Sequence, residues 1–293
     1  MRTEERNPAS ENLDRMSPVE IVRLMSREDE QVGRAVLAAE EEIVRAIEAV
    51  ADCYGRGGTT IYVGAGTSGR VAGLDVAELP PTFGVEPGRF VVLAPGGTLG
   101  SADEAAEDNR NQARRDLENL LRSLGPGARR GEEAVVRMPA GAPVRSSHLA
   151  VGITASGTTP YVLEAISCAA ENGLPTIGVC NNPGAPLLDA VDIPVLLDTG
   201  PEVITGSTRL KAGTAQKMTL NMISVGAMVL CGRVRGNLMS HMNPVSEKLR
   251  LRAVRIVRTQ LGLGETEARR VLEESNWSLS AVLREKVRQP AAE

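Results

Sequence analysis

Apolar residues are distributed along the chain in two alternating patterns. Short runs rich in β-branched residues predict buried strands, and the segments between them, where apolar residues recur at helical spacing, predict crossover helices. The expected strands lie near 60–63, 90–93, 149–153, 175–179 and 193–197. Strands that alternate with helices form βαβ units, so we expect an α/β fold with a doubly wound parallel sheet flanked by helices.

Both flanks of this core have helical patterns. Residues 18–51 carry apolar residues at helical spacing, which predicts an N-terminal helical arm. Residues 261–286 have the rhythm of a small helical bundle, with Trp277 and Leu279 expected in its core. We therefore divide the chain into an arm at 1–49, a central domain at 50–230 and a C-terminal helical region at 231–293.

One long segment, 125–147, has no apolar periodicity and interrupts the α/β rhythm. Its glycine, proline and arginine content predicts a surface loop or a partly disordered insert. Its arginines Arg129, Arg130 and Arg137 are expected to be solvated.

A glycine-rich turn follows the first expected strand and leads into a helix. Three glycines between residues 64 and 69 allow a sharp turn, while Thr67 and Ser68 place hydroxyl groups where the helix begins. The unpaired N–H groups of a helix start favour an anion such as phosphate. The same letters fit the dinucleotide fingerprint GxGxxG, but the next strand runs into Ala-Pro-Gly-Gly at 94–97 and lacks the acidic residue that would hold a ribose.

Residues 149–170 repeat this pattern of strand, polar loop and helix. The loop carries Ser156, Thr158 and Thr159, which we predict to bind phosphate, with Ser68 contacting the sugar or phosphate from the first loop. A serine in a loop is more often a turn former, but two such loops at strand ends can bracket one small phosphorylated ligand.

A third polar segment, within 202–224, precedes a long apolar helix. It contributes Ser207 and Lys211 as candidate ligand-binding residues, because a helix start and an ammonium group both suit anions. The alternative for Lys211 is an ordinary surface lysine.

Composition narrows the partners of the chain. Its 293 residues have a net charge of −4 and a pI near 5.5, which disfavours nucleic acid as a partner. We expect a cytoplasmic protein without a membrane partner, since neither a signal peptide nor a membrane-spanning apolar run is visible. Four cysteines without CxxC spacing and two histidines predict neither a metal site nor a cofactor held by one.

Several longer sequence segments carry a specific resemblance to a known family. They are TEERNPASENLDRMS at 3–17, LDVAELPPTFGV at 74–85, AAEDNR at 105–110, EVITGSTRLKAGTAQKMTLNMIS at 202–224 and GNLM at 236–239. In this order, over nearly the whole chain, they resemble the N-acetylmuramic acid 6-phosphate etherase family, while the two polar loops alone are similar to the sugar isomerase (SIS) domain.

The resemblance implies a reaction and an assembly. The family cleaves the D-lactyl ether of N-acetylmuramic acid 6-phosphate by elimination and hydration, giving N-acetylglucosamine 6-phosphate and D-lactate without a metal or organic cofactor. It also implies a SIS-type sheet domain, a C-terminal bundle resembling the ubiquitin-associated fold, and a homodimer with the active site near the subunit boundary.

Two glutamates match the family's functional positions. We expect Glu78 in the last helical turn before Pro80 and Pro81, where the negative end of the helix dipole disfavours its charged form and suits a proton donor. An exposed helix-end glutamate is the alternative. Glu107, expected to share a helix face with Glu104 and Asp108, is selected by the resemblance alone as the partner acid or base.

The chain departs from the family's pattern at three positions. Thr158 stands where we expect an arginine, and His241 and Ser246 stand where the family usually has aspartate and asparagine. Two other functions also stay open, because SIS domains serve in regulators as well and an isomerase would use similar proton chemistry. One is a phosphosugar sensor without catalysis, which no DNA-binding motif supports, and the other is an aldose–ketose phosphosugar isomerase.

Overall fold

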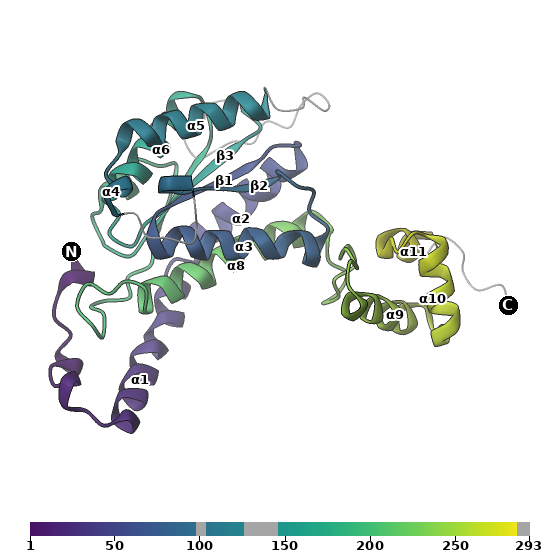
Figure 1. Ribbon diagram of the computed structural model, residues 1–293, viewed down its shortest axis with the longest axis horizontal. Helices are drawn as coiled ribbons and strands as arrows, with labels where there is room; N and C mark the ends of the chain where they lie inside the picture. Colours follow the sequence, from purple (N-terminus) through teal and green to yellow (C-terminus); the bar gives the residue numbers. More distant parts are fainter. Residues whose placement is uncertain (98–103, 126–145, 286–293) are drawn as a thin grey trace. The chain divides into compact units, whose positions relative to one another are not determined.

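The computed structural model describes residues 1–97, 104–125 and 146–285 (Figure 1). The expected loop at 125–147 falls almost wholly outside the described residues. The chain forms two compact units: one contains Met1–Val76 and Gly88–Ala227, and the other contains Ala77–Pro87 and Met228–Glu293. Each unit is described by itself below.

A parallel sheet forms the centre of the first unit. Its strands are β1 (Thr60–Gly64), β2 (Phe90–Leu93), β3 (Leu149–Ile153), β4 (Thr176–Cys180) and β5 (Ile193–Leu196), and their order is β2-β1-β3-β4-β5. Every neighbouring pair is parallel, which confirms the α/β prediction. The chain winds from β1 to β2 on one side and then crosses to β3 on the other. Ligands of such sheets bind outside the carboxyl ends of the strands at this reversal.

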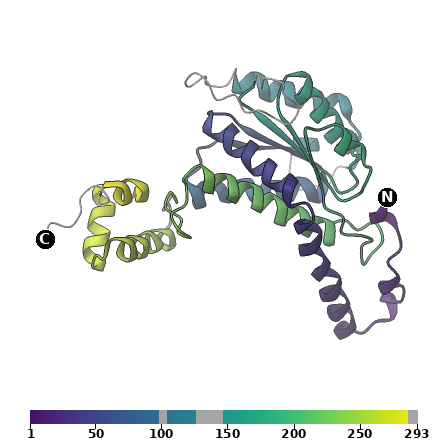
Figure 2. The same cartoon turned by 180° about the vertical axis from the view of Figure 1, so that it is seen from behind.

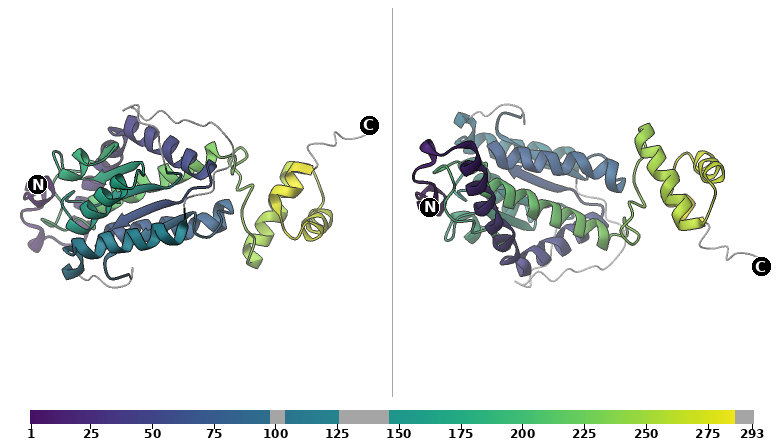
Figure 3. Two further views of the ribbon diagram at one scale, coloured as in Figure 1. Left: turned by 90° about the horizontal axis from the view of Figure 1, so that it is seen from above. Right: turned by 90° about the horizontal axis from the view of Figure 1, so that it is seen from below.

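Helices cover both faces of this sheet. On one face lie α5 (Arg110–Leu124) and α6 (Pro160–Glu171), as the left view of Figure 3 shows. On the other lie α2 (Glu40–Gly55), α3 (Gly66–Phe83) and α8 (Lys211–Leu230), seen in its right view. The remaining elements of this unit are α1 (Pro18–Leu37), α4 (Glu104–Glu107), α7 (Pro186–Asp189) and short 3-10 turns at Arg2–Glu4, Pro8–Ser10, Leu13–Arg15 and Pro95–Gly97.

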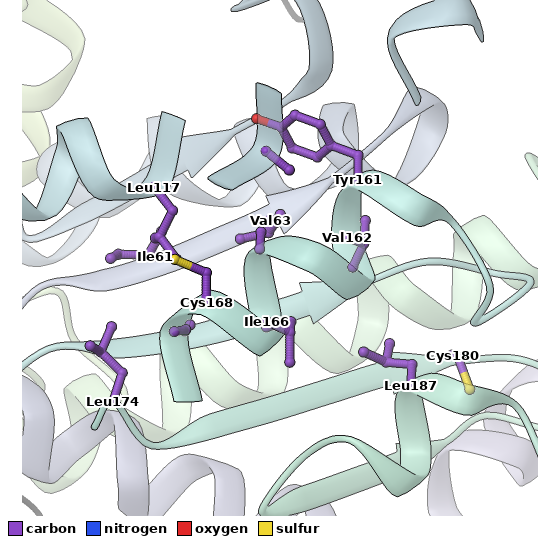
Figure 4. Close-up of a cluster of buried hydrophobic side chains, with 14 of the residues drawn as sticks. Ile61, Val63, Leu117, Tyr161, Val162, Ile166, Cys168, Leu174, Cys180 and Leu187 are labelled. Carbon is purple, nitrogen blue, oxygen red and sulfur yellow. The ribbon is translucent and has the colours of Figure 1, made fainter. Parts of the chain in front are cut away.

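The hydrophobic core between the sheet and α6 draws that helix close to β3 (Figure 4). Val162 and Ile166 of α6 are completely buried. A Cβ atom on Gly152 would lie 2.7 Å from Ile166 Cγ1, so only glycine allows this approach. The close packing brings the start of α6, and with it Thr159, to the carboxyl edge of the sheet.

The predicted helical arm consists of two helices that divide at Ala38–Ala39. A capping box between Ser17 and Glu20 starts α1. Its apolar face buries Leu24 and Val32, which are each 2% exposed. The helical spacing at 18–51 is therefore present, but as α1 and α2.

The second unit has a core of its own. Helices α9 (Glu247–Leu261), α10 (Glu265–Glu274) and α11 (Leu279–Glu285) bury a cluster that includes Leu272 and Leu279. Leu279 belongs to this core as expected, whereas Trp277 is only partly buried. Its ring lies 5.0 Å from the guanidinium of Arg250 and 5.9 Å from that of Arg269. Such contacts are cation–π interactions at the edge of the bundle.

Candidate active site

The first polar loop turns sharply, and its glycines allow the close backbone approach that this turn requires. A Cβ atom on Gly69 would lie 2.6 Å from the carbonyl oxygen of Gly64, and Gly66 has a positive φ of 54°. Neither position admits an ordinary side chain without strain. The turn places the start of α3 directly after β1, at the edge of the sheet where β3 also ends.

Glu107 lies against this glycine turn. Its Oε1 is 3.3 Å from the position that a Cβ atom on Gly66 would occupy, and the residue is half-buried. The structure therefore brings one of the two predicted catalytic carboxylates to the first loop. The helix face expected to include Asp108 does not form, because α4 ends at Glu107 and α5 begins at Arg110 with its own Asn109 cap.

The second polar loop is a cluster of hydroxyl groups after β3. Thr154 Oγ1 lies 2.7 Å from Thr159 Oγ1 and 3.2 Å from Ser156 Oγ. Ser156 Oγ also accepts hydrogen bonds from the N–H and the hydroxyl of Thr158, at 3.1 and 3.0 Å. Gly157 has a φ of 71°, and a Cβ atom there would lie 2.3 Å from Ala185 Cβ. The predicted phosphate-binding residues are thus neighbours on one tightly folded turn.

Ser68 links the first loop to α8 and to the residue after β4 through groups that the sequence did not single out. Its hydroxyl donates to Gln216 Oε1 at 2.8 Å, and Gln216 Nε2 donates to Asn181 Oδ1 at 3.0 Å. These three residues are at most 7% exposed. Thr67 packs its methyl group near Gly213. The structure therefore shows Ser68 in a supporting network, and its predicted substrate contact stays untested.

Lys211 is buried in an ion pair instead of lying at the surface. Its Nζ is 2.6 Å from Glu28 Oε2, and its side chain is 1% exposed. Burial alone would raise the pKa of Glu28, but hydrogen bonds from Lys211 and Asn7 hold it below its usual value. The surface alternative for Lys211 is therefore wrong, and its ammonium already has a carboxylate partner within the chain.

The N-terminal N–H groups of α8 are also occupied. Glu202 is completely buried, and its carboxylate accepts from the N–H groups of Lys211 at 3.0 Å and Ala212 at 2.9 Å. Burial raises the pKa of Glu202, although these two hydrogen bonds oppose the shift. Ser207, half-buried in the preceding loop, donates its N–H to Ile204 O at 2.9 Å. The third polar segment thus contains its own anion at the helix start.

The helix that carries Glu78 does not end where proline was expected to end it. Helix α3 continues through Pro80 and Pro81 to Phe83, and Gly84 N–H donates to Pro80 O at 3.0 Å. The expected position of Glu78 in the last turn is therefore wrong. Glu78 is exposed and belongs to the second unit, while Glu107 belongs to the first. The pairing of these carboxylates remains a prediction.

A buried carboxylate holds α3 against its neighbours. Asp75 is 5% exposed and accepts hydrogen bonds from Asn221 at 2.6 Å and Ser224 at 2.9 Å, both on α8, and from the hydroxyl of Tyr62 on β1 at 3.3 Å. Burial raises the pKa of Asp75 against these donors. The contacts fix the direction in which α3 leaves the glycine turn.

Two kinds of feature are missing from the part of the chain that the structure describes. It has no group of three or more histidine, cysteine, aspartate or glutamate side chains able to hold a metal ion. None of its helices has both the length and the apolar character needed to cross a membrane.

Comparisons with known proteins agree with this architecture. A family model for the SIS domain matches residues 116–226, and one for the glucokinase regulatory protein N-terminal SIS domain matches residues 42–170. A solved structure assigned as a phosphosugar isomerase involved in capsule formation, from Bacteroides fragilis, superposes with a TM-score of 0.51 at 19% identity, covering 75% of this chain and 98% of that one. This likeness shows the fold.

Relatives of higher identity extend over almost the full length. The N-acetylmuramic acid 6-phosphate etherase of Rubrobacter xylanophilus is 45% identical over 273 residues, covering 92% of this chain and 83% of that protein. The Deinococcus radiodurans etherase is 42% identical over 286 residues, covering 96% of this chain and 86% of that protein. The chain belongs to the N-acetylmuramic acid 6-phosphate etherase family.

Proposed function

We propose that this protein is a carbon–oxygen lyase that cleaves the D-lactyl ether of N-acetylmuramic acid 6-phosphate. The products are N-acetylglucosamine 6-phosphate and D-lactate. The observation that carries this proposal is the identity of 40–45% to etherases over more than nine-tenths of the chain. The position of Glu107 beside the glycine turn supports it, because the reaction needs a carboxylate at the edge where the sugar phosphate would bind.

The chemistry follows from the open-chain form of the sugar. The lactyl ether is at C3, β to the C1 aldehyde, so the proton on C2 is acidic. Glu107 removes this proton, a C2–C3 double bond forms, and the C3–O bond breaks. Glu78 protonates the departing lactate oxygen. Water then adds across the double bond, with its hydroxyl at C3 and a proton at C2.

The second polar loop, residues 154–159 after β3, is proposed to hold the phosphate. We call it the hydroxyl loop. Ser156, Thr158 and Thr159 lie on one turn at the start of α6, where the helix N-terminus favours an anion. No positively charged side chain is part of this turn, since Thr158 stands where we expected an arginine in the family. Binding here then depends on hydroxyl and backbone N–H donors, with Thr67 and Ser207 as further candidate contacts.

Ser156→Ala is expected to raise KM for N-acetylmuramic acid 6-phosphate about tenfold and to leave kcat nearly unchanged, because a hydrogen bond to a charged group is lost. Steady-state D-lactate release measures both constants. Ser123→Ala is the matched control, since its hydroxyl donates to Leu120 O within α5. An unchanged KM in Ser156→Ala would remove Ser156 from the phosphate site.

We also infer a homodimer. Leu74 on α3 and Met222 and Val225 on α8 are 55%, 42% and 45% exposed, and these two helices run side by side on one face of the sheet (Figures 1 and 3). Large apolar side chains on adjacent helices are typical of a surface that another protein covers. The C-terminal helices, which have their own core, are proposed to form a bundle of the ubiquitin-associated type.

A coupled D-lactate assay on the purified protein tests the proposed function. We expect lactate and N-acetylglucosamine 6-phosphate in equal amounts. Tight binding of the sugar phosphate without turnover would favour a sensor. Interconversion of aldose and ketose phosphates without lactate would favour an isomerase.

A further inference from the structure

Thr3 connects two segments at the carboxyl edge of the sheet. The residue is completely buried. Its N–H donates to Asn182 Oδ1 at 3.2 Å, and its hydroxyl accepts from Asn182 Nδ2 at 2.9 Å. Its carbonyl accepts from Gly206 N–H at 3.1 Å. One residue of the first 3-10 turn thereby holds the loop after β4 and the loop before α8. The start of the chain lies beside the loop before α8 in Figure 2.

Asn182 extends this connection to the hydroxyl loop. It is 2% exposed, and its Nδ2 also donates to Ala155 O at 2.9 Å. Both hydrogens of the amide are thus used, one for the loop that contains Ser156 and one for Thr3. The hydrogen bonds form a continuous path from the hydroxyl loop through Asn182 and Thr3 to the loop that contains Ser207.

A second set of contacts holds the same region from the N-terminal side. Asn7 Nδ2 donates to Glu28 Oε2 at 2.7 Å and to Pro201 O at 3.4 Å, and Glu28 pairs with Lys211. A Cβ atom on Gly206 would lie 2.9 Å from Glu4 Oε2. Three of these contacts reach the segment 201–211, at Pro201, Gly206 and Lys211. The first residues of the chain therefore brace the loop between β5 and α8.

We propose that Thr3 and Asn182 are positioning residues that set the spacing between the hydroxyl loop at 154–159 and the loop at 203–210. They act on the substrate through these loops and not by touching it. The proposal rests on the proposed function in that both loops carry predicted substrate contacts. It makes the first residues of the chain part of the active-site framework.

Thr3→Val tests the proposal. The variant keeps the shape of the residue and both backbone hydrogen bonds but removes the acceptor for Asn182 Nδ2, which is left buried without that partner. We expect KM for the sugar phosphate to rise about fivefold with kcat within about twofold of the wild type. Thr3→Ser retains the hydroxyl and should restore KM. Backbone amide exchange at 154–159 and 203–207 should be faster in Thr3→Val.

Thr219→Val is the matched control, because Thr219 is completely buried and its hydroxyl has no hydrogen-bond partner among the described residues. An equal rise of KM in this control, or an unchanged KM and exchange rate in Thr3→Val, would overturn the proposal. If the wild type released no lactate, the dissociation constant for N-acetylglucosamine 6-phosphate would replace KM. A failure of the proposed reaction and a failure of the positioning role are thereby distinguished.

Discussion

Glu107→Gln is expected to lower kcat for D-lactate release by a factor of about 10² to 10⁴, with little change in KM, because a positioned acid or base contributes about that much to the rate. Gln keeps the size of the side chain beside Gly66 but can neither accept the C2 proton nor return it. Glu78→Gln is expected to lose a similar factor, since the lactate oxygen would leave without a proton. Steady-state assays of both variants measure these losses.

Hydrogen exchange at C2 separates the two roles. In D₂O, a variant that retains the base exchanges the C2 proton of the substrate even when the ether is not cleaved. We expect Glu78→Gln to keep this exchange and Glu107→Gln to lose it, together with lactate release. The reverse result would exchange their assignments. Asp108→Asn, an exposed neighbour of Glu107, is the control, and turnover like that of the wild type in either glutamine variant would remove that residue from the mechanism.

The sheet and its two polar loops could be predicted because local and tertiary preferences agree there. The β-branched run before Gly64 is both a good strand and a completely buried one. Glycine is required in the turn that follows, because Gly66 has a positive φ and the backbones of Gly64 and Gly69 are in close contact. Residues of this kind indicate their structure from the sequence itself.

The end of α3 could not be predicted from the same rules. Proline removes one N–H group and disfavours the helical conformation of the preceding residue, so a pair of prolines usually ends a helix. Here Pro80 and Pro81 lie inside α3, and packing overrides the local preference: Leu79 and Phe83, on either side of the pair, are 2% and 6% exposed. Glu78 therefore lies more than one turn before the end of α3, and not in its last turn.

Hydrogen-bond and ion-pair partners that are distant in the sequence could not be predicted either. Gln216 and Asn181 carry no local signal of their link to Ser68, and nothing near Lys211 indicates that Glu28, on α1, supplies its counter-ion. A lysine in a polar segment before a helix is usually a surface or ligand-binding residue. Only the packing of α1 against the start of α8 distinguishes the buried ion pair from these alternatives.

Lys211→Met is expected to lower the free energy of unfolding by about 3 kcal/mol, because Glu28 would then keep a buried charge without its ion partner. The lower end of the usual range applies, since Asn7 still donates to the Glu28 carboxylate. Urea denaturation followed by circular dichroism measures the loss. The double variant Lys211→Met/Glu28→Gln should regain most of this stability, because it removes both charges together.

Measuring KM and stability on the same variants distinguishes a ligand-binding role of Lys211 from a structural one. A lysine that bound phosphate through its ammonium would raise KM when replaced, with stability little affected, and the Glu28→Gln change would not restore binding. A lysine committed to Glu28 gives the opposite pattern, in which stability falls in the single variant and returns in the double. Unchanged unfolding in Lys211→Met together with a large rise in KM would show that Lys211 serves the ligand after all, and that the ion pair opens for it.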